Sequence, residues 1–174
     1  MTRHLVFVFG TLKEGFPNFA TNKGRRVAGD FVTKERYPFY LVGERHSPWL
    51  LDQPGEGERI VGQVFEVDEA ALEAMDVLER INEPDGYRRK TISVASCAAE
   101  DPTPIDVFVY MKQAGHFVRS EARLGPLREY TLEHAALYRP RPRLEELLLD
   151  GALSQAGEPA DPAYFEKLRK RVLG

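Results

Sequence analysis

Cysteine is almost absent from this chain, since Cys97 is the only one among 174 residues. A lone cysteine cannot form a disulfide within the chain, so core packing must stabilise the fold, which suits a reducing compartment. Long hydrophobic runs are also missing, because no segment approaches the ~18 apolar residues of a membrane-spanning helix. The N-terminus has neither the apolar stretch nor the small-residue cleavage site of a secretory signal. We therefore expect a soluble cytoplasmic protein.

The chain has little surplus of charge of either sign, because 24 basic residues stand against 27 acidic ones and give a net charge of −3. Such a balance provides no overall field to attract nucleic acid or an anionic membrane. Basic residues do gather at 139–143 and 167–171, where they form either a solvated surface or a nucleic-acid contact. The overall balance favours the solvated surface, and we expect neither nucleic acid nor a membrane as a partner.

The motifs of several enzyme classes are missing as well. The sequence has no Walker loop, no dinucleotide fingerprint and no Gly-x-Ser-x-Gly nucleophile elbow. Its histidines, which show no metal-ligand spacing, are His4, His46, His116 and His134. Cys97 has small neighbours on a predicted strand, so it is either a nucleophile or a plain structural thiol. We expect neither a metal nor a cofactor.

What the chain does have is a hydrophobic content of 43% over the length of one domain, enough to build a core. Short apolar segments separated by turns predict strands, and these lie at 6–9, 26–32, 37–42, 59–67, 87–96 and 105–111. The segment 47–58 is rich in proline and glycine and predicts a long structured turn. We expect these strands to form a small mixed or antiparallel β-barrel.

One helix interrupts the strands. Asp68 can cap its first turn, and Val67 with Leu72 can form a hydrophobic staple there. The apolar stripe of the helix consists of Leu72, Met75, Leu78 and Ile81, and the turn residues 82–86 end it. This helix is therefore expected to pack against the barrel through its stripe.

The character of the chain changes after Gly125. Helical patterns follow at 127–138, 144–153 and 162–173. We therefore expect an α+β fold with two parts. The barrel and its packed helix occupy residues 1–125, and a helical C-terminal extension occupies residues 126–174.

Two features carry candidate chemistry. The apolar run at 6–9 ends at Gly10, which has no Cβ to block a ligand. A small-residue turn of this kind is either a plain tight turn or a set of backbone N–H donors for a carboxylate. Glu79 lies near the end of the predicted helix, where it is either a solvated surface group or a general acid/base.

Several short motifs in a fixed order resemble a known family. The segment 7–13, with Gly15, Pro17 and Asn18, resembles the Tyr-Gly-Ser/Thr-Leu signature of the gamma-glutamylcyclotransferase-like (AIG2-like) proteins, most closely the gamma-glutamylamine cyclotransferase branch. The later motifs agree in order, and they are 48–50, 55–57, 61–65 and 75–79, followed by Tyr87 and Arg89. The resemblance covers roughly residues 5–112.

The resemblance implies a reaction that needs no enzyme nucleophile. The α-amine of a gamma-glutamyl amide attacks its own γ-carbonyl, which closes 5-oxoproline and releases an amine. The family's catalytic carboxylate falls on Glu79, which would act as general acid/base. Its substrate-binding residues fall on the loop Phe9, Gly10, Thr11 and Leu12, with Tyr87 and Arg89 as further candidates.

Some positions keep a second interpretation. Phe9 stands where the family usually has tyrosine, so a hydroxyl is lost and the substrate range is affected. Arg89 either orients Glu79, binds a substrate carboxylate or pairs with a surface acid, and Tyr87 is either a site residue or a core residue. The alternative function is a non-catalytic module that binds a small ligand through the same loop.

Overall fold

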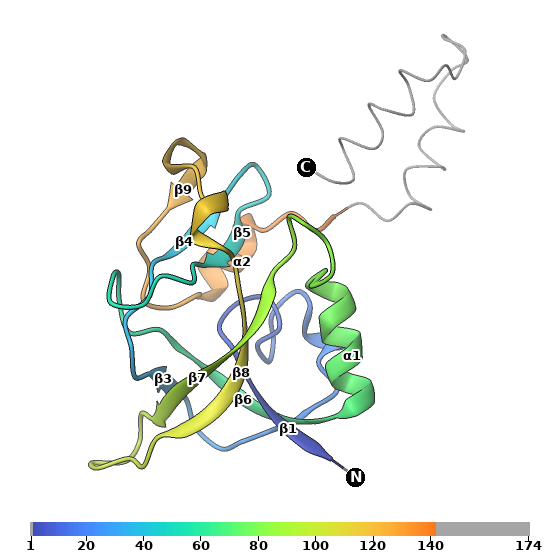
Figure 1. Ribbon diagram of the computed structural model, residues 1–174, viewed down its shortest axis with the longest axis vertical. Coiled ribbons are helices and arrows are strands. Elements are labelled where there is room, and N and C mark those ends of the chain that lie inside the picture. Colours follow the sequence, from blue (N-terminus) through green and yellow to red (C-terminus); the bar gives the residue numbers. More distant parts are fainter. Residues whose placement is uncertain (1, 142–174) are drawn as a thin grey trace, which may run out of the picture. The chain divides into compact units, whose positions relative to one another are not determined.

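A computed structural model describes residues 2–141 of the chain (Figure 1). The helices predicted at 144–153 and 162–173 lie outside these residues. The chain divides into two compact units, and the first of them ends at Tyr138. Within residues 2–141, no helix is long and apolar enough to cross a membrane.

The main sheet has six strands and closes on itself. Its order is β1 (Arg3–Val8), β8 (Ile105–Met111), β7 (Arg88–Ser96), β3 (Phe31–Thr33), β6 (Val61–Asp68) and β2 (Arg25–Arg26). A further antiparallel pairing between β1 and β6 completes the ring, and the β1–β8 pair is parallel. Together with the packed helix, this curled mixed sheet confirms the predicted α+β fold.

A second sheet of three strands lies beside the first. Its order is β5 (Ser47–Leu50), β4 (Phe39–Val42) and β9 (Ala122–Leu124). Strand β5 corrects the predicted turn over 47–58, since its Leu50 is fully buried. The strand tolerates Pro48 because β5 is an edge strand of this sheet, where a missing N–H costs no ladder bond.

The helix α1 (Glu69–Leu78) begins as predicted. The Asp68 carboxylate accepts a hydrogen bond of 2.9 Å from the Ala71 N–H and so caps the first turn. Leu72 and Met75 are buried where α1 packs against β1 and β6. The predicted stripe is wrong at Leu78, which is 36% exposed, whereas Ile81, beyond the end of α1, packs on the same core.

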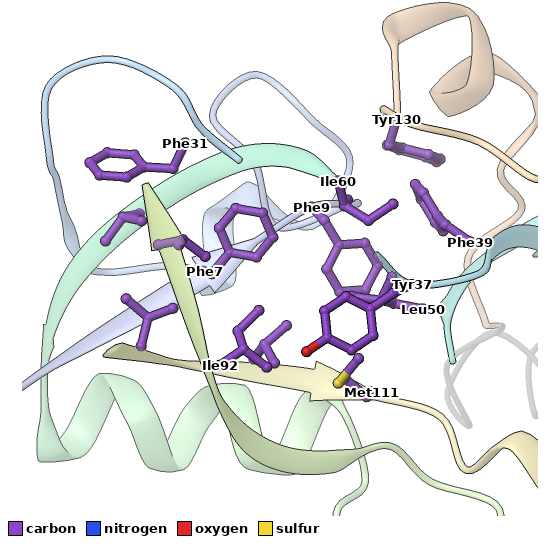
Figure 2. Close-up of a cluster of buried hydrophobic side chains, with 14 of the residues drawn as sticks. Phe7, Phe9, Phe31, Tyr37, Phe39, Leu50, Ile60, Ile92, Met111 and Tyr130 are labelled. Atoms are coloured by element: carbon purple, nitrogen blue, oxygen red, sulfur yellow. The ribbon is translucent and has the colours of Figure 1, made fainter. Parts of the chain in front are cut away.

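The two larger clusters of buried side chains among the described residues lie on the two faces of β1. Phe7 and Phe9 point into the inner core shown in Figure 2. Val6 and Val8 point the other way, into a helix-side core that they share with Leu12 and residues of α1. This alternation follows from the period of two along a strand. Strand β1 is therefore packed on both faces where it leads into the turn at Gly10.

Residues 127–138 belong to this folded unit rather than to a separate extension. The Leu127 N–H donates to the Phe39 carbonyl at 2.8 Å, and the Val61 N–H donates to the Arg128 carbonyl at 2.9 Å. Tyr130 is fully buried in the inner core (Figure 2). The helix predicted over 127–138 is therefore shorter, and α2 spans only Leu132–Leu137. Short 3₁₀ turns complete the fold at Phe19–Thr21, Ala114–His116 and Arg119–Glu121.

Replacing Tyr130 by phenylalanine is expected to stabilise the protein. Within the described residues, the Tyr130 hydroxyl is buried and has no hydrogen-bond partner, a situation that costs about 1–3 kcal/mol. Its removal should raise the melting temperature by roughly 2–4 °C for about 1 kcal/mol gained in a chain of this size. Calorimetry tests this, with Tyr110→Phe as the contrast. The Tyr110 hydroxyl donates to Asp76 at 2.7 Å, so that variant should melt lower.

Candidate active site

The turn after β1 exposes a row of backbone donors. Lys13 donates its N–H to the Gly10 carbonyl at 3.1 Å, which closes the turn. Thr11 and Leu12 are buried. Within residues 2–141, however, the N–H groups of Gly10, Thr11 and Leu12 donate no hydrogen bond. Buried backbone N–H groups are nearly always paired, so this row, called the donor loop below, is a candidate binding site.

Backbone N–H groups and one side-chain amide fix the donor loop by binding its carbonyl groups. The Asn18 N–H donates to the Thr11 carbonyl at 2.9 Å, and the Asn22 amide donates to the Leu12 carbonyl at 3.1 Å. In a trans peptide the C=O and the following N–H point in opposite directions. Because the Gly10 and Thr11 carbonyls face protein donors, the N–H groups of Thr11 and Leu12 are turned away from them.

Tyr87 links the donor loop to the end of α1. Its hydroxyl donates to the Pro48 carbonyl at 2.8 Å, and its N–H donates to the Glu79 carbonyl at 2.9 Å. Pro48 in turn packs on Gly10 so closely that a Cβ there would lie 2.9 Å from the Pro48 ring. The path Glu79–Tyr87–Pro48–Gly10 thus brings three predicted site residues into one connected region.

Glu79 is half-buried at the C-terminal end of α1. Its N–H donates to the Met75 carbonyl at 2.9 Å, and the next residue, Arg80, turns the chain away with a φ of 53°. The charge of Glu79 is one of the causes that raise the pKa of Tyr110. Burial raises that pKa first, the hydrogen bond to Asp76 adds to it, and the charge of Glu79 raises it further.

Arg89 pairs with an acid of α1. Its guanidinium lies 2.5 Å from the Asp76 carboxylate, which also accepts the Tyr110 hydroxyl. The same guanidinium lies over the ring of Phe108, 5.0 Å from its centroid. Of the three interpretations offered by the sequence, this geometry matches the pairing with an acid. Arg89 and Tyr110 thereby fix the turn of α1 that precedes Glu79.

Phe9 contributes packing rather than a polar group. Its ring lies in the inner core and meets Phe39 edge to face, with the ring centroids 5.2 Å apart (Figure 2). Leu12 and Tyr87 belong to the helix-side core instead. The structure therefore places the Phe9 side chain apart from the cluster that joins the donor loop to Glu79.

Lys112 is a charged member of this region that the sequence did not indicate. It is 5% exposed, and its ammonium lies 4.5 Å from the Trp49 ring centroid and 4.4 Å from that of Tyr87. It also donates to the Asp85 carbonyl. These partners come from separate segments, so no local sequence pattern reveals them. Lys112 holds the turn that leads into Tyr87.

The alternatives based on cysteine or metal gain no support. Cys97 is exposed, and burial together with the charge of Asp30 raises the pKa of its thiol. A raised pKa leaves less thiolate, which is the nucleophilic form. In the described part of the chain, no three His, Cys, Asp or Glu side chains gather as a metal-binding group.

Comparisons with known proteins agree with the sequence motifs. A family model described as "Gamma-glutamyl cyclotransferase, AIG2-like" matches residues 6–141. Gamma-glutamylaminecyclotransferase B of Danio rerio is 38% identical over 62% of this chain and 59% of its own length. The Bos taurus gamma-glutamylaminecyclotransferase is 41% identical over 60% of this chain and 63% of its own length. The chain thus spans less than two thirds of these two relatives.

Other relatives are covered more fully. The Homo sapiens gamma-glutamylaminecyclotransferase is 35% identical over 79% of this chain and 97% of its own length. A crystal structure of a Mus musculus aig2-like protein superimposes with a TM-score of 0.67 at 30% identity, covering 83% of this chain and 99% of that one. The matched region includes the donor loop, Tyr87 and Glu79.

Proposed function

Because this chain belongs to the gamma-glutamyl cyclotransferase, AIG2-like family, we propose that it converts gamma-glutamyl amides to 5-oxoproline and a free amine in a reducing, cytoplasmic compartment. In this reaction the substrate's α-nitrogen forms a bond to its own γ-carbonyl carbon. The amide bond from that carbon to the leaving nitrogen then breaks. A proton moves from the attacking nitrogen to the leaving one, so no external co-reactant is consumed.

The donor loop carries this proposal. Its three N–H groups, on Gly10, Thr11 and Leu12, donate no bond within residues 2–141 and suit the α-carboxylate of the glutamyl group. Holding that carboxylate fixes one end of the substrate so that the amine can fold back onto the carbonyl. Well-oriented intramolecular attack reaches effective molarities of roughly 10⁵–10⁸ M. The enzyme's main task is therefore to impose a conformation.

Glu79 supplies the proton transfer. A half-buried carboxylate linked to the donor loop through Tyr87 can accept the proton of the attacking amine and return it to the leaving amine. Tyr87 serves here as the spacer between the two halves of the site. Arg89 has a supporting role, because its ion pair with Asp76 fixes the helix end that carries Glu79.

The direct test is an assay of 5-oxoproline release from a panel of gamma-glutamyl amides whose leaving groups are simple amines, the lysine side chain and peptides. We expect release from at least one class. Two matched controls should release none, namely the α-amide isomers and the same gamma-glutamyl amides with an acetylated α-amine, because neither offers the required attack. If the gamma-glutamyl amides of the panel stabilise the protein thermally but none of them releases 5-oxoproline, the non-catalytic binding module is favoured instead.

A further inference from the structure

Tyr138 lies at the end of the folded unit and reaches back to the donor loop. It is the C-terminal cap of α2, where its N–H donates to the Ala135 carbonyl at 3.1 Å. Its phenolic oxygen accepts a hydrogen bond of 3.3 Å from the Asn18 amide and one of 3.4 Å from Arg45. The Arg45 guanidinium also lies over the Tyr138 ring, 5.9 Å from its centroid.

Asn18 connects Tyr138 to the donor loop. The amide nitrogen that donates to Tyr138 is also 2.9 Å from the Thr11 hydroxyl. The Asn18 N–H donates to the Thr11 carbonyl at 2.9 Å as well. Asn18 therefore binds both the side chain and the backbone of Thr11. The hydrogen bond to Tyr138 restricts the rotamer of the Asn18 side chain.

A second contact fastens the loop to the same segment of the chain. Lys13 directly follows the donor loop in the sequence. Its ammonium donates to the Tyr130 carbonyl at 2.6 Å and lies 3.7 Å from the Glu129 carboxylate. Lys13 is 4% exposed. Residues 129–138 thus hold the loop at two points, at Thr11 through Asn18 and at Lys13 directly after the loop.

We propose that Tyr138 is a positioning residue of the active site, which acts through Asn18 to keep the donor loop in its substrate-binding conformation. This proposal rests on the proposed function of the loop. A preorganised loop binds the carboxylate without first losing conformational freedom, and this advantage is the same for the bound substrate and the transition state. Loss of the contact should therefore weaken substrate binding rather than slow the chemical step.

The first test replaces Tyr138 by phenylalanine, which removes only the hydroxyl. We expect KM for the best gamma-glutamyl amide to rise roughly threefold to tenfold, the usual worth of one hydrogen bond, with kcat changed by less than about twofold. Tyr40→Phe is the matched control, because the Tyr40 hydroxyl also accepts from an arginine, Arg119, at 2.7 Å. The Arg119 guanidinium also lies over the Tyr40 ring, 5.2 Å from its centroid, as that of Arg45 does over the Tyr138 ring. That variant should leave KM unchanged.

A double-mutant cycle tests the route through Asn18. In an Asn18→Ala background the Tyr138 hydroxyl has lost its connection to Thr11, so Tyr138→Phe should cause no further rise in KM. An equal rise in both backgrounds would overturn the proposal, and so would an unchanged KM in the single variant.

Hydrogen exchange separates this proposal from the assignment of activity. The N–H groups of Lys13 and Asn18, which bind the Gly10 and Thr11 carbonyls, should exchange faster in Tyr138→Phe than in the wild type and in Tyr40→Phe, whether or not any substrate is turned over. Faster exchange in Tyr138→Phe, combined with a wild type that releases no 5-oxoproline, would contradict the proposed function but not the role of Tyr138. Unchanged exchange in an active enzyme would sink the role of Tyr138 alone.

Discussion

Replacing Glu79 by glutamine is expected to lower kcat for 5-oxoproline release by about 10²–10⁴-fold, the usual worth of a positioned acid/base group. Glutamine keeps the size of the side chain but cannot take a proton from the attacking amine. Glu79 ends α1, and its backbone bonds to Met75 and Tyr87 do not involve the carboxylate, so the fold should tolerate the change. The measurement is kcat under saturating substrate, together with the melting temperature.

Glu73→Gln provides the matched control for this experiment. Glu73 lies on the same helix and is exposed, so the same loss of charge there should leave kcat near the wild-type value. A folded Glu79→Gln enzyme with wild-type kcat would remove the carboxylate from the mechanism. The donor loop could still bind the substrate in that case, and folding of the substrate would account for the whole rate.

Replacing Gly86 by alanine is expected to be the most damaging small substitution near the site. A Cβ at this position would lie 1.7 Å from the Arg80 carbonyl oxygen and 2.6 Å from its carbon, both backbone atoms that cannot rotate away. Overpacking of this kind costs about 3 kcal/mol, which corresponds to a melting temperature lowered by roughly 6–12 °C in a chain of this size.

The same change should reduce activity at temperatures where the variant is folded. Gly86 directly precedes Tyr87, whose N–H binds the Glu79 carbonyl, so a shifted turn misplaces the acid/base group. A misplacement of about 1 Å can cost roughly 10²-fold in rate. Gly115→Ala is the control, because a Cβ there meets nothing within 4 Å. Equal melting temperatures for the two variants would show that the turn relaxes at no cost.

Local patterns in the sequence predicted the parts of the fold that depend on neighbouring residues. The cap at Asp68 was recognisable because its partner, Ala71, lies three positions away. The strand Ile105–Met111 has the predicted bounds, since its apolar residues before Met111 are β-branched or aromatic. The donor loop was also recognisable, because Gly10 ends a buried strand and the motif that contains it is contiguous.

Features that depend on distant residues could not be predicted in this way. Segment 127–131 looks helical in isolation, yet hydrogen bonds to Phe39 and Val61 hold it in a non-helical conformation with one bridge at Glu129. Arg89 could not be assigned a partner until β7 was placed beside α1. The buried ammonium of Lys112 requires the rings of Trp49 and Tyr87, which approach it from other segments. Such contacts arise from tertiary packing and leave no periodic signal.

The donor loop has a consequence for how this protein tolerates mutation. The groups proposed to bind the substrate are main-chain N–H groups, which every side-chain replacement except proline retains. A replacement at Thr11 must also keep the hydroxyl that Asn18 binds. The vulnerable positions are instead Asn18, whose side chain binds the Thr11 hydroxyl, and Asn22, whose side chain binds the Leu12 carbonyl. A replaced side chain within the loop is thus weak evidence that a related protein has lost activity, whereas replacement of Asn18 or Asn22 is stronger evidence.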